Sequence, residues 1–364
     1  MTRKRTLRRD EFSEQDRIFM ARALELAEGG RPTAHPNPYV GAVIVHGGTV
    51  LAEGFHSRFG ASHAEAAAIA SAREQGISLE GATLYVTLEP CCHSGKTPPC
   101  TKAIIESRIG EVIVAVRDPN PAVNGEGIAR LEKAGLRVRS GLLEEEAVKL
   151  NEAYFHFRRT GLPFVTWKCC RTLDGRTTYR PGTRSRISSP EADARVDRLR
   201  ASVDAVLVGS RTAAIDRPRL RVRSGAGTDP WRIVFDSRLV TPLDSPLVAE
   251  NSDRRTLMIA AEGASSERIA EYRDAGVEVD VVPERNGHVD PRAALARIAE
   301  RGIIEILCES GETLGRALME EGLLRRVLLL QTPRLTERES GEIEAIEEVG
   351  PDLFISVGMS CRGN

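Results

Sequence analysis

The sequence lacks any apolar run that approaches the ~20 residues needed to span a bilayer. The basic N-terminus, Thr2–Arg9, is not followed by the apolar segment of a secretory signal, so residues 1–14 are interpreted as a flexible basic tail. A nucleic-acid arm is the alternative, but the formal net charge of −1 over 364 residues gives it little support. We therefore expect neither a membrane nor a nucleic-acid partner.

Cysteine and aromatic residues are both sparse. The seven cysteines are an odd number, and four of them form the adjacent pairs Cys91-Cys92 and Cys169-Cys170, which are poorly placed for disulfides. A reduced, cytoplasmic setting fits this usage. Aromatic residues make up 4% of the chain and do not alternate with basic residues, which argues against a nucleic-acid-editing protein. An apolar content of 41% and the length of the chain suit a globular protein of two domains.

Four residues with side chains suited to metal binding and proton transfer occur in an informative order. His63 and Glu65 are followed by Pro90-Cys91 and Pro99-Cys100. One imidazole and two thiolates can hold zinc and leave its fourth position open for water, and Glu65 can move protons to and from that water. The order resembles the signature of zinc-dependent base deaminases. The alternative is a structural zinc site or a chance cluster, but a closed site would need a fourth ligand and would give Glu65 no role.

The first half alternates helix and strand patterns. Helices are predicted over 16–28, 64–73, 101–107, 127–134 and 144–157, and strands over 39–45, 50–54, 82–88, 111–116 and 136–140, with Gly47-Gly48 as a hairpin turn. This alternation predicts a three-layer α/β sandwich. His63 and Glu65 fall at the start of one helix and Cys100 at the start of another, where the helix dipole favours a thiolate and metal binding.

Further segments of this half match one family. They are His35-Pro36-Asn37-Pro38, Gly54-Phe55-His56, the long loop from Leu88 to Cys100, Asp118-Pro119-Asn120-Pro121 and Gly125-Glu126-Gly127. They resemble the deaminase half of the bifunctional riboflavin-biosynthesis deaminase/reductases. The resemblance implies a cytidine-deaminase-like domain over residues 15–157, with the zinc ligands His63, Cys91 and Cys100 and the catalytic residue Glu65.

The same resemblance implies substrate-binding roles for Asn37, His56, Lys96, Asp118 and Asn120. For three of these residues a plainer interpretation stays open. Lys96 can be a solvated loop lysine, and Asp118 and Asn120 can form Asx turns before the prolines that follow them.

The second half is expected to be another α/β domain, over residues 163–364, after a boundary near 158–163. Strands are predicted over 164–168, 205–208, 232–235, 256–259, 277–282, 304–308 and 327–331, and helices over 190–200, 265–275 and 291–301. Lys168 with the run Thr172–Thr177, the run Asp204–Gly209, and the run Glu309–Leu314 resemble the reductase half of the same family.

This second resemblance implies a dihydrofolate-reductase-like fold that uses NADP(H). It implies catalytic roles for Lys168 and Asp216. The residues implied to bind the cofactor are Thr212, Asp216, Ser237, Gly311 and Thr313, and those implied to bind the substrate are Arg200, Leu220, Arg223 and Glu309. A glycine turn by itself is weak evidence for a nucleotide, and Gly311 can simply begin a helix.

Four residues depart from the family pattern. Arg184 stands where the family has a small hydroxyl residue, Arg186 where it has tryptophan, Arg217 where it has a second aspartate, and Tyr39 where it has asparagine. The expected function is zinc-dependent deamination of a diaminopyrimidinone ribosylamino phosphate, followed by NADPH-dependent reduction of its ribose, in a homo-oligomer. The alternatives are a deaminase for another amino-heterocycle with a silent or repurposed second domain, and a zinc-binding module without catalysis.

Overall fold

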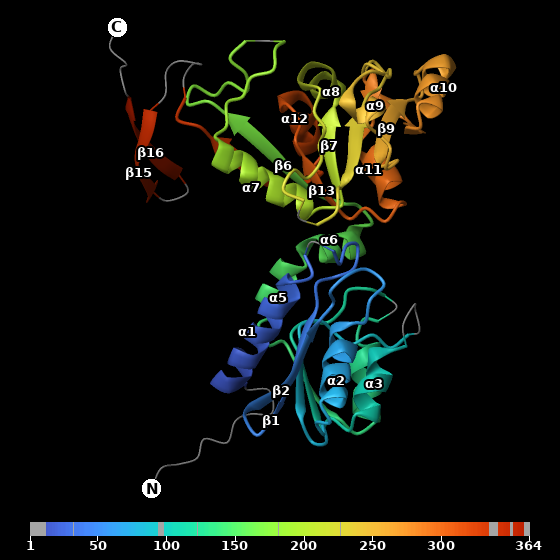
Figure 1. The fold of residues 1–364 in the computed structure, drawn as a ribbon, viewed down its shortest axis with the longest axis vertical. Coiled ribbons are helices and arrows are strands. Elements are labelled where there is room, and N and C mark those ends of the chain that lie inside the picture. Colours follow the sequence, from blue (N-terminus) through green and yellow to red (C-terminus); the bar gives the residue numbers. More distant parts are fainter. Residues whose placement is uncertain are drawn as a thin grey trace. The chain divides into compact units, whose positions relative to one another are not determined.

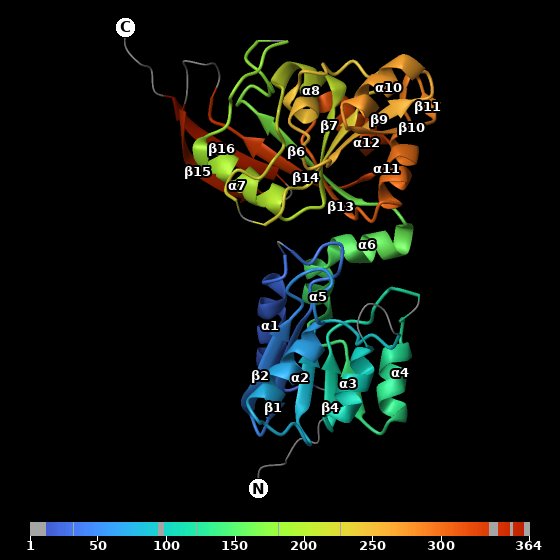
Figure 2. The ribbon, with the colours of Figure 1, turned by 45° about the vertical axis from the view of Figure 1, so that its right-hand side comes forward.

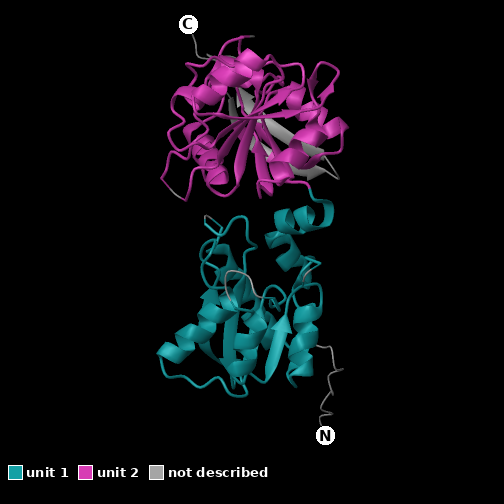
Figure 3. Ribbon diagram, turned by 90° about the vertical axis from the view of Figure 1, so that its right-hand side faces the viewer, with its two compact units in different colours: residues 1–161 teal, residues 162–364 magenta. Residues whose placement is uncertain are grey.

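A computed structural model describes residues 12–31, 33–93, 98–121, 123–180, 182–225, 227–334, 341–349 and 352–359. The chain divides into two compact units, one ending at Gly161 and the other beginning at Leu162 (Figure 3). Lys96 lies outside the described residues. Among the described residues, none belongs to a helix that is both long and apolar enough to cross a bilayer.

The first unit is a three-layer α/β sandwich. Its elements are α1 (Glu14–Glu28), β1 (Gly41–His46), β2 (Thr49–Phe55), α2 (Ala64–Glu74), β3 (Thr83–Val86), α3 (Cys100–Glu106), β4 (Glu111–Val114), α4 (Glu126–Lys133), β5 (Arg137–Ser140), α5 (Glu144–Leu150) and α6 (Glu152–Thr160). The strand order is β2-β1-β3-β4-β5, in which β1 is antiparallel to both its neighbours and β3, β4 and β5 are parallel. Helices α2, α3 and α4 cover one face of the sheet, and α1 and α5 cover the other (Figures 1 and 2).

Local sequence explains how the first unit begins. The Ser13 hydroxyl accepts from the amide of Asp16 while the Asp16 carboxylate accepts from the amide of Ser13, so a capping box starts α1. The β1–β2 hairpin turns at Gly47 and Gly48, as predicted, and both glycines have positive φ angles. A close approach of backbones then fixes α2: a Cβ on Gly54 of β2 would lie 2.5 Å from both the carbonyl oxygen of Ala64 and the amide nitrogen of Ala68.

The second unit contains a seven-stranded parallel sheet. Its elements are β6 (Phe164–Arg171), α7 (Pro190–Ala201), β7 (Ala205–Gly209), α8 (Ser210–Asp216), β8 (Trp231–Phe235), α9 (Pro246–Ala249), β9 (Thr256–Ala261), α10 (Ser266–Asp274), β10 (Glu278–Val282), β11 (Glu284–Arg285), β12 (His288–Val289), α11 (Pro291–Ala299), β13 (Glu305–Cys308), α12 (Glu312–Glu320), β14 (Leu324–Gln331), β15 (Gly341–Val349) and β16 (Asp352–Met359). The sheet order is β10-β9-β8-β7-β13-β6-β14, and the pairs β11–β12 and β15–β16 are separate antiparallel hairpins.

Alternate residues of the central strands build two cores. In β7, Ala205 and Leu207 pack with residues of α11 and α12, whereas Val206 and Val208 pack with residues of α8, α9 and α10. A parallel sheet covered on both faces needs apolar residues at successive positions, which is why these strands read as continuous apolar runs.

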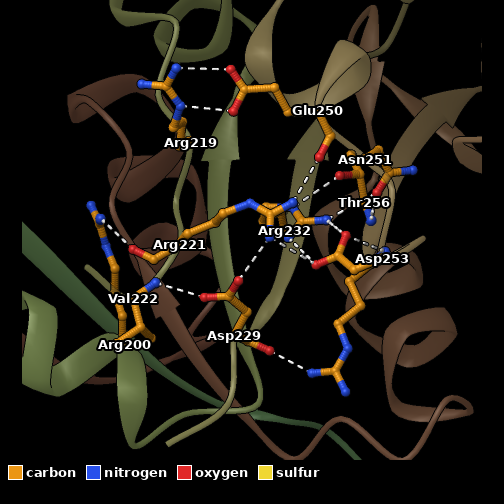
Figure 4. Close-up of polar contacts among 11 residues, drawn as sticks. Arg200, Arg219, Arg221, Val222, Asp229, Arg232, Glu250, Asn251, Asp253 and Thr256 are labelled. Carbon is orange, nitrogen blue, oxygen red and sulfur yellow. Dashed lines mark hydrogen bonds and ion pairs between the residues drawn. The ribbon is translucent and has the colours of Figure 1, made fainter. Parts of the chain in front are cut away.

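A buried cation joins β8 to the segment before β9. Arg232 of β8 is 2% exposed, and its guanidinium donates to the Asp253 carboxylate at 2.9 Å, to Asn251 Oδ1 at 3.0 Å and to Thr256 Oγ1 at 3.1 Å (Figure 4). Burial of this charge is tolerated because acceptors surround it.

The predicted fold class is confirmed, with three local differences. The helix predicted over 144–157 is two helices, because Asn151 leaves helical geometry and its side chain pairs with both the amide and the carbonyl of Tyr39, at 2.7 and 2.8 Å. Helices α8, α9 and α12 were not among the predicted elements. Strand β15 was not predicted either, and Ile343 and Ile346 are exposed on it.

We expect Gly54→Ala to lower the free energy of unfolding by about 1–3 kcal/mol, because its methyl group would overlap the backbone of α2. Thermal unfolding measures the change. Gly209→Ala is the matched control, since its φ of −90° suits alanine and its methyl would meet nothing nearer than 3.8 Å. Equal melting temperatures for the two variants would contradict the close approach.

Candidate active sites

Three potential metal ligands meet from three separate segments. His63 caps the N-terminus of α2, Cys91 follows β3, and Cys100 is the first residue of α3. His63 Nδ1 lies 3.5 Å from Cys91 Sγ and 3.2 Å from Cys100 Sγ, and one ligand atom from each residue falls within 4.8 Å of the others. Ligands of a tetrahedral zinc ion lie about 3.5–3.8 Å apart, so these residues fit zinc with one position left for a non-protein ligand.

Hydrogen bonds already favour negative charge at this cluster. The Cys100 thiol donates to Cys91 and, with further hydrogen bonds from His63 and the Cys100 amide, lowers the pKa of Cys91 to about 4. The pKa of Cys100 is raised, because that same hydrogen bond and burial hold its proton. The hydrogen bond to Cys91 raises the pKa of His63. A divalent cation would replace the shared proton, which is the exchange expected of a thiolate site.

Glu65 lies beside the cluster without belonging to it. The side chain is 3% exposed, and burial, followed by the negative charge on Cys91, raises the pKa of Glu65 to about 7. A carboxyl group with such a pKa can both accept and return a proton near neutral pH.

The predicted deaminase residues line one cavity of about 310 Å³. The predicted residues on its wall are Asn37, His56, His63, Glu65, Cys91, Asp118 and Asn120. His56 is held by Asn37 Nδ2 on one ring nitrogen and by the carbonyl of Ser62 on the other, each at 3.0 Å. Burial lowers the pKa of His56, so the neutral ring is favoured.

Asp118 is fixed by its neighbours at the cavity wall. Its Oδ1 accepts from the amide of Asn120 and from the hydroxyl of Tyr154, each at 2.9 Å, so the Asx turn is formed. Burial raises the pKa of Asp118 despite these hydrogen bonds. The turn orders the wall of the cavity and does not exclude a contact between Asp118 and a substrate.

Sequence reasoning gave no role to Glu89, Tyr154 or Arg158, which also line the cavity. Glu89 is 3% exposed and accepts from the amides of Asp118, Gly125, Gly127 and Ile128 at 2.9–3.2 Å. One buried carboxylate thus anchors both the loop that carries Asp118 and the start of α4. The signal for Glu89 in the sequence was its position, as a single acidic residue between an apolar strand and Pro90-Cys91.

Charged residues gather at the carboxyl ends of the central strands in the second unit. Trp167 of β6 pairs with Cys308 of β13, so the residues that follow them, Lys168 and Glu309, are neighbours. Lys168 Nζ lies 3.6 Å from Glu309 Oε2. Arg200 of α7 donates to both oxygens of Glu309, at 2.6 and 3.0 Å. Burial opposes ionisation of Glu309, but these partners keep the pKa of Glu309 below its usual range.

The remaining predicted reductase residues are arranged around these strand ends. Thr212 and Asp216 belong to α8, which follows β7. Burial raises the pKa of Asp216, although the positive charges of Arg184 and Lys168 act to lower it. Gly311 caps α12 with open space around it, and Thr313 lies in the first turn of that nine-residue helix. Free amides at such a helix start suit a cofactor phosphate, so the residues present fit NADP(H).

Three predicted residues make structural contacts elsewhere in this unit. Ser237 Oγ accepts from the amide of Val289 at 3.0 Å, Leu220 is buried with a φ of +53°, and the amide of Arg223 donates to Asp197 at 2.8 Å. No contact recorded for the described residues joins these three directly to Lys168 and Glu309. Their binding roles stay predictions.

The four departures from the family pattern have different surroundings. Arg186 is exposed and pairs with Asp193 at 2.9 Å, and Arg217 is exposed and pairs with Asp244 at 3.0 Å. Arg184 is exposed and contributes its charge near Asp216. Tyr39 is buried and is not part of the described cavity wall, so it gives no support to a changed deaminase substrate.

Comparisons with known proteins agree with both halves of this arrangement. A family model of the cytidine and deoxycytidylate deaminase zinc-binding region matches residues 13–116, and one of the RibD C-terminal domain matches residues 163–339. The chain is 42% identical over 327 residues to the riboflavin biosynthesis protein RibD of Chlamydia muridarum, covering 88% of this chain and 86% of that protein. It is 38% identical to RibD of Escherichia coli, covering 88% of each.

Solved structures match nearly the full length of the chain. RibD of Acinetobacter baumannii superposes with a TM-score of 0.80 at 31% identity, covering 96% of this chain and 99% of that one. A diaminohydroxyphosphoribosylaminopyrimidine deaminase/5-amino-6-(5-phosphoribosylamino)uracil reductase of Thermotoga maritima superposes with a TM-score of 0.79 at 32% identity, covering 95% and 99%.

We expect the purified chain to hold about one equivalent of zinc by elemental analysis, and Cys100→Ser to lose it, because a hydroxyl is a poor ligand for this ion. Cys92→Ser is the matched control, since Cys92 is adjacent to a ligand but outside the set. If Cys100→Ser kept its zinc and Cys92→Ser lost it, the zinc ligand would be Cys92 and the assignment to Cys100 would be wrong.

Proposed function

The chain belongs to the family of bifunctional riboflavin-biosynthesis deaminase/reductases, and from that premise we propose how its own residues divide the two reactions. The enzyme deaminates a diaminopyrimidinone ribosylamino phosphate with a zinc-binding domain and reduces the ribose of the product with an NADPH-dependent domain. The observation that carries the assignment of residues to the first step is the single cavity shared by His63, Glu65 and Cys91.

In the first reaction, His63, Cys91 and Cys100 hold zinc, which when bound supplies a hydroxide nucleophile near neutral pH. Glu65 takes a proton released at this position and delivers it to the departing amine, because its carboxyl group is buried beside the ligands and outside their set. Asn37 and His56, which hold each other, orient the ring, and Asp118 and Asn120 contribute polar contacts at the wall.

In the second reaction, Lys168 and Asp216 lie near the reacting groups, and NADPH supplies the hydride. The buried contacts with Glu309 fix the Lys168 ammonium group. We assign cofactor binding to Thr212, Asp216, Ser237, Gly311 and Thr313, and substrate binding to Arg200, Leu220, Arg223 and Glu309. The open start of α12 supports the cofactor assignment, and the Arg200–Glu309 pair supports that of the substrate.

We also propose a cytoplasmic homo-oligomer. The reduced thiols that zinc binding requires at Cys91 and Cys100 support this compartment. The oligomer is supported by the family to which the chain belongs.

Glu65→Gln should keep zinc and the fold but lower the rate of ammonia release by about 10²–10⁴, because the amide cannot carry the proton. The assay follows ammonia release from the phosphorylated substrate, together with zinc content. Glu74→Gln, an exposed change at the other end of α2, should leave both unchanged. Near-normal turnover in Glu65→Gln would remove the proton-transfer role.

Lys168→Met should lower NADPH consumption on the deaminated intermediate at least about tenfold, since it removes the cation beside Glu309 at the carboxyl end of β13. Ammonia release from the diaminopyrimidinone substrate, measured separately on the same enzyme preparation, is the control and should not change. Arg186→Trp should alter NADPH consumption less than about threefold, because an exposed ion pair contributes little. NADPH binding without any turnover in the parent enzyme would favour a silent or repurposed second domain.

A further inference from the structure

The deaminase cavity has a buried floor and an exposed rim. Glu65, His56 and Glu89 are each 3% exposed on its floor. Phe59 and Arg158 are exposed on its wall. The carbon that loses its amine must reach Glu65, so the heterocycle occupies the buried part and the rest of the substrate extends toward the rim.

The substrate phosphate has the opposite requirement. Its negative charge is costly to remove from water unless a cation and hydrogen-bond donors replace the solvent. Among the described residues that line the cavity, Arg158 of α6 is the one arginine or lysine. It therefore offers what the phosphate needs at the exposed part of the wall.

Among the described residues, no carboxylate forms an ion pair with the Arg158 guanidinium, although its charge acts on the nearby Asp118. The guanidinium stacks on the ring of Tyr154, 5.1 Å from the centroid, one helical turn earlier on α6. The Tyr154 hydroxyl in turn donates to Asp118, which fixes the ring. A stacked guanidinium keeps its N–H edge available, and its planar fork matches two phosphate oxygens.

We propose that Arg158 binds the phosphate of the deaminase substrate and makes the deaminase prefer a phosphorylated ribosylamino ring to the free nucleoside. This inference rests on the proposed function and extends it by assigning a specificity-determining residue.

The neighbouring Arg159 supplies a matched control. It belongs to the same helix and also stacks on an aromatic ring, with its guanidinium 5.4 Å from the centroid of Phe155. It lines a different cavity, beside Ser140 and Glu144, whose described residues have only Asp118 in common with the deaminase wall. Removal of its charge therefore changes the net charge of α6 equally without touching the proposed phosphate site.

The experiment measures kcat/KM for ammonia release from the phosphorylated substrate and from its dephosphorylated counterpart. For Arg158→Gln we expect a loss of about 10- to 100-fold on the phosphorylated compound, the value of a charge-assisted hydrogen bond, and less than about a twofold change on the other. Arg158→Lys should recover part of the loss, and Arg159→Gln should behave as the parent enzyme. Inorganic phosphate should inhibit the parent enzyme competitively and inhibit Arg158→Gln more weakly.

Two results would overturn the inference, and they differ from failure of the function itself. Equal losses on both compounds would make Arg158 a positioning residue for Tyr154 and Asp118. An unchanged preference for the phosphorylated compound would place the phosphate elsewhere. Release of no ammonia from either compound by the zinc-loaded parent enzyme would instead refute the deaminase assignment, and the role of Arg158 with it.

Discussion

The first unit is organised by one requirement: an imidazole and two thiols from three distant segments must meet within bonding distance of one ion. Each supporting feature serves that meeting. Gly54 lets α2 approach β2 and so fixes where His63 and Glu65 emerge. The start of α3 supplies Cys100 and its amide, which donates to Cys91. The buried Glu89 carboxylate, two residues before Cys91, fixes the loop on the other side of the cavity. The mutual hydrogen bonds of the ligands hold this geometry in the protonated cluster.

The zinc ligands, Glu65 and most strands could be predicted from the sequence, because they depend on residue type and short-range periodicity. The break between helices α5 and α6 at Asn151 could not be predicted. It arises because the amide side chain of Asn151 pairs with the backbone of Tyr39, more than a hundred positions away. For the same reason Arg158 was noticed only as part of a boundary: its place on the cavity wall depends on how α6 packs. The strand β15 was not predicted, because Ile343 and Ile346 are three residues apart and an irregularity between Ile343 and Ala345 breaks the period of two that indicates a strand.

In the second unit, largely buried charged side chains from separate segments also meet, and they compensate one another as an ion cluster. Arg200 and Glu309 compensate each other's burial, and Lys168 of β6 completes the group beside the carboxyl end of β13. Departures from the family pattern that looked severe in the sequence have milder surroundings in the fold. Arg186 and Arg217 are exposed and have carboxylate partners of their own. Arg184 differs, because its charge acts near Asp216.

The division of the chain after Gly161 bears on how metabolic flux is handled. Every described residue of the deaminase cavity belongs to the first unit, and every described residue of the ion cluster belongs to the second. The two reactions therefore use separate sets of residues, although one polypeptide supplies both in equal numbers. A mutation confined to the ion cluster would slow the second reaction and enlarge the pool of deaminated intermediate, while the residues that act in the first reaction stay as they are.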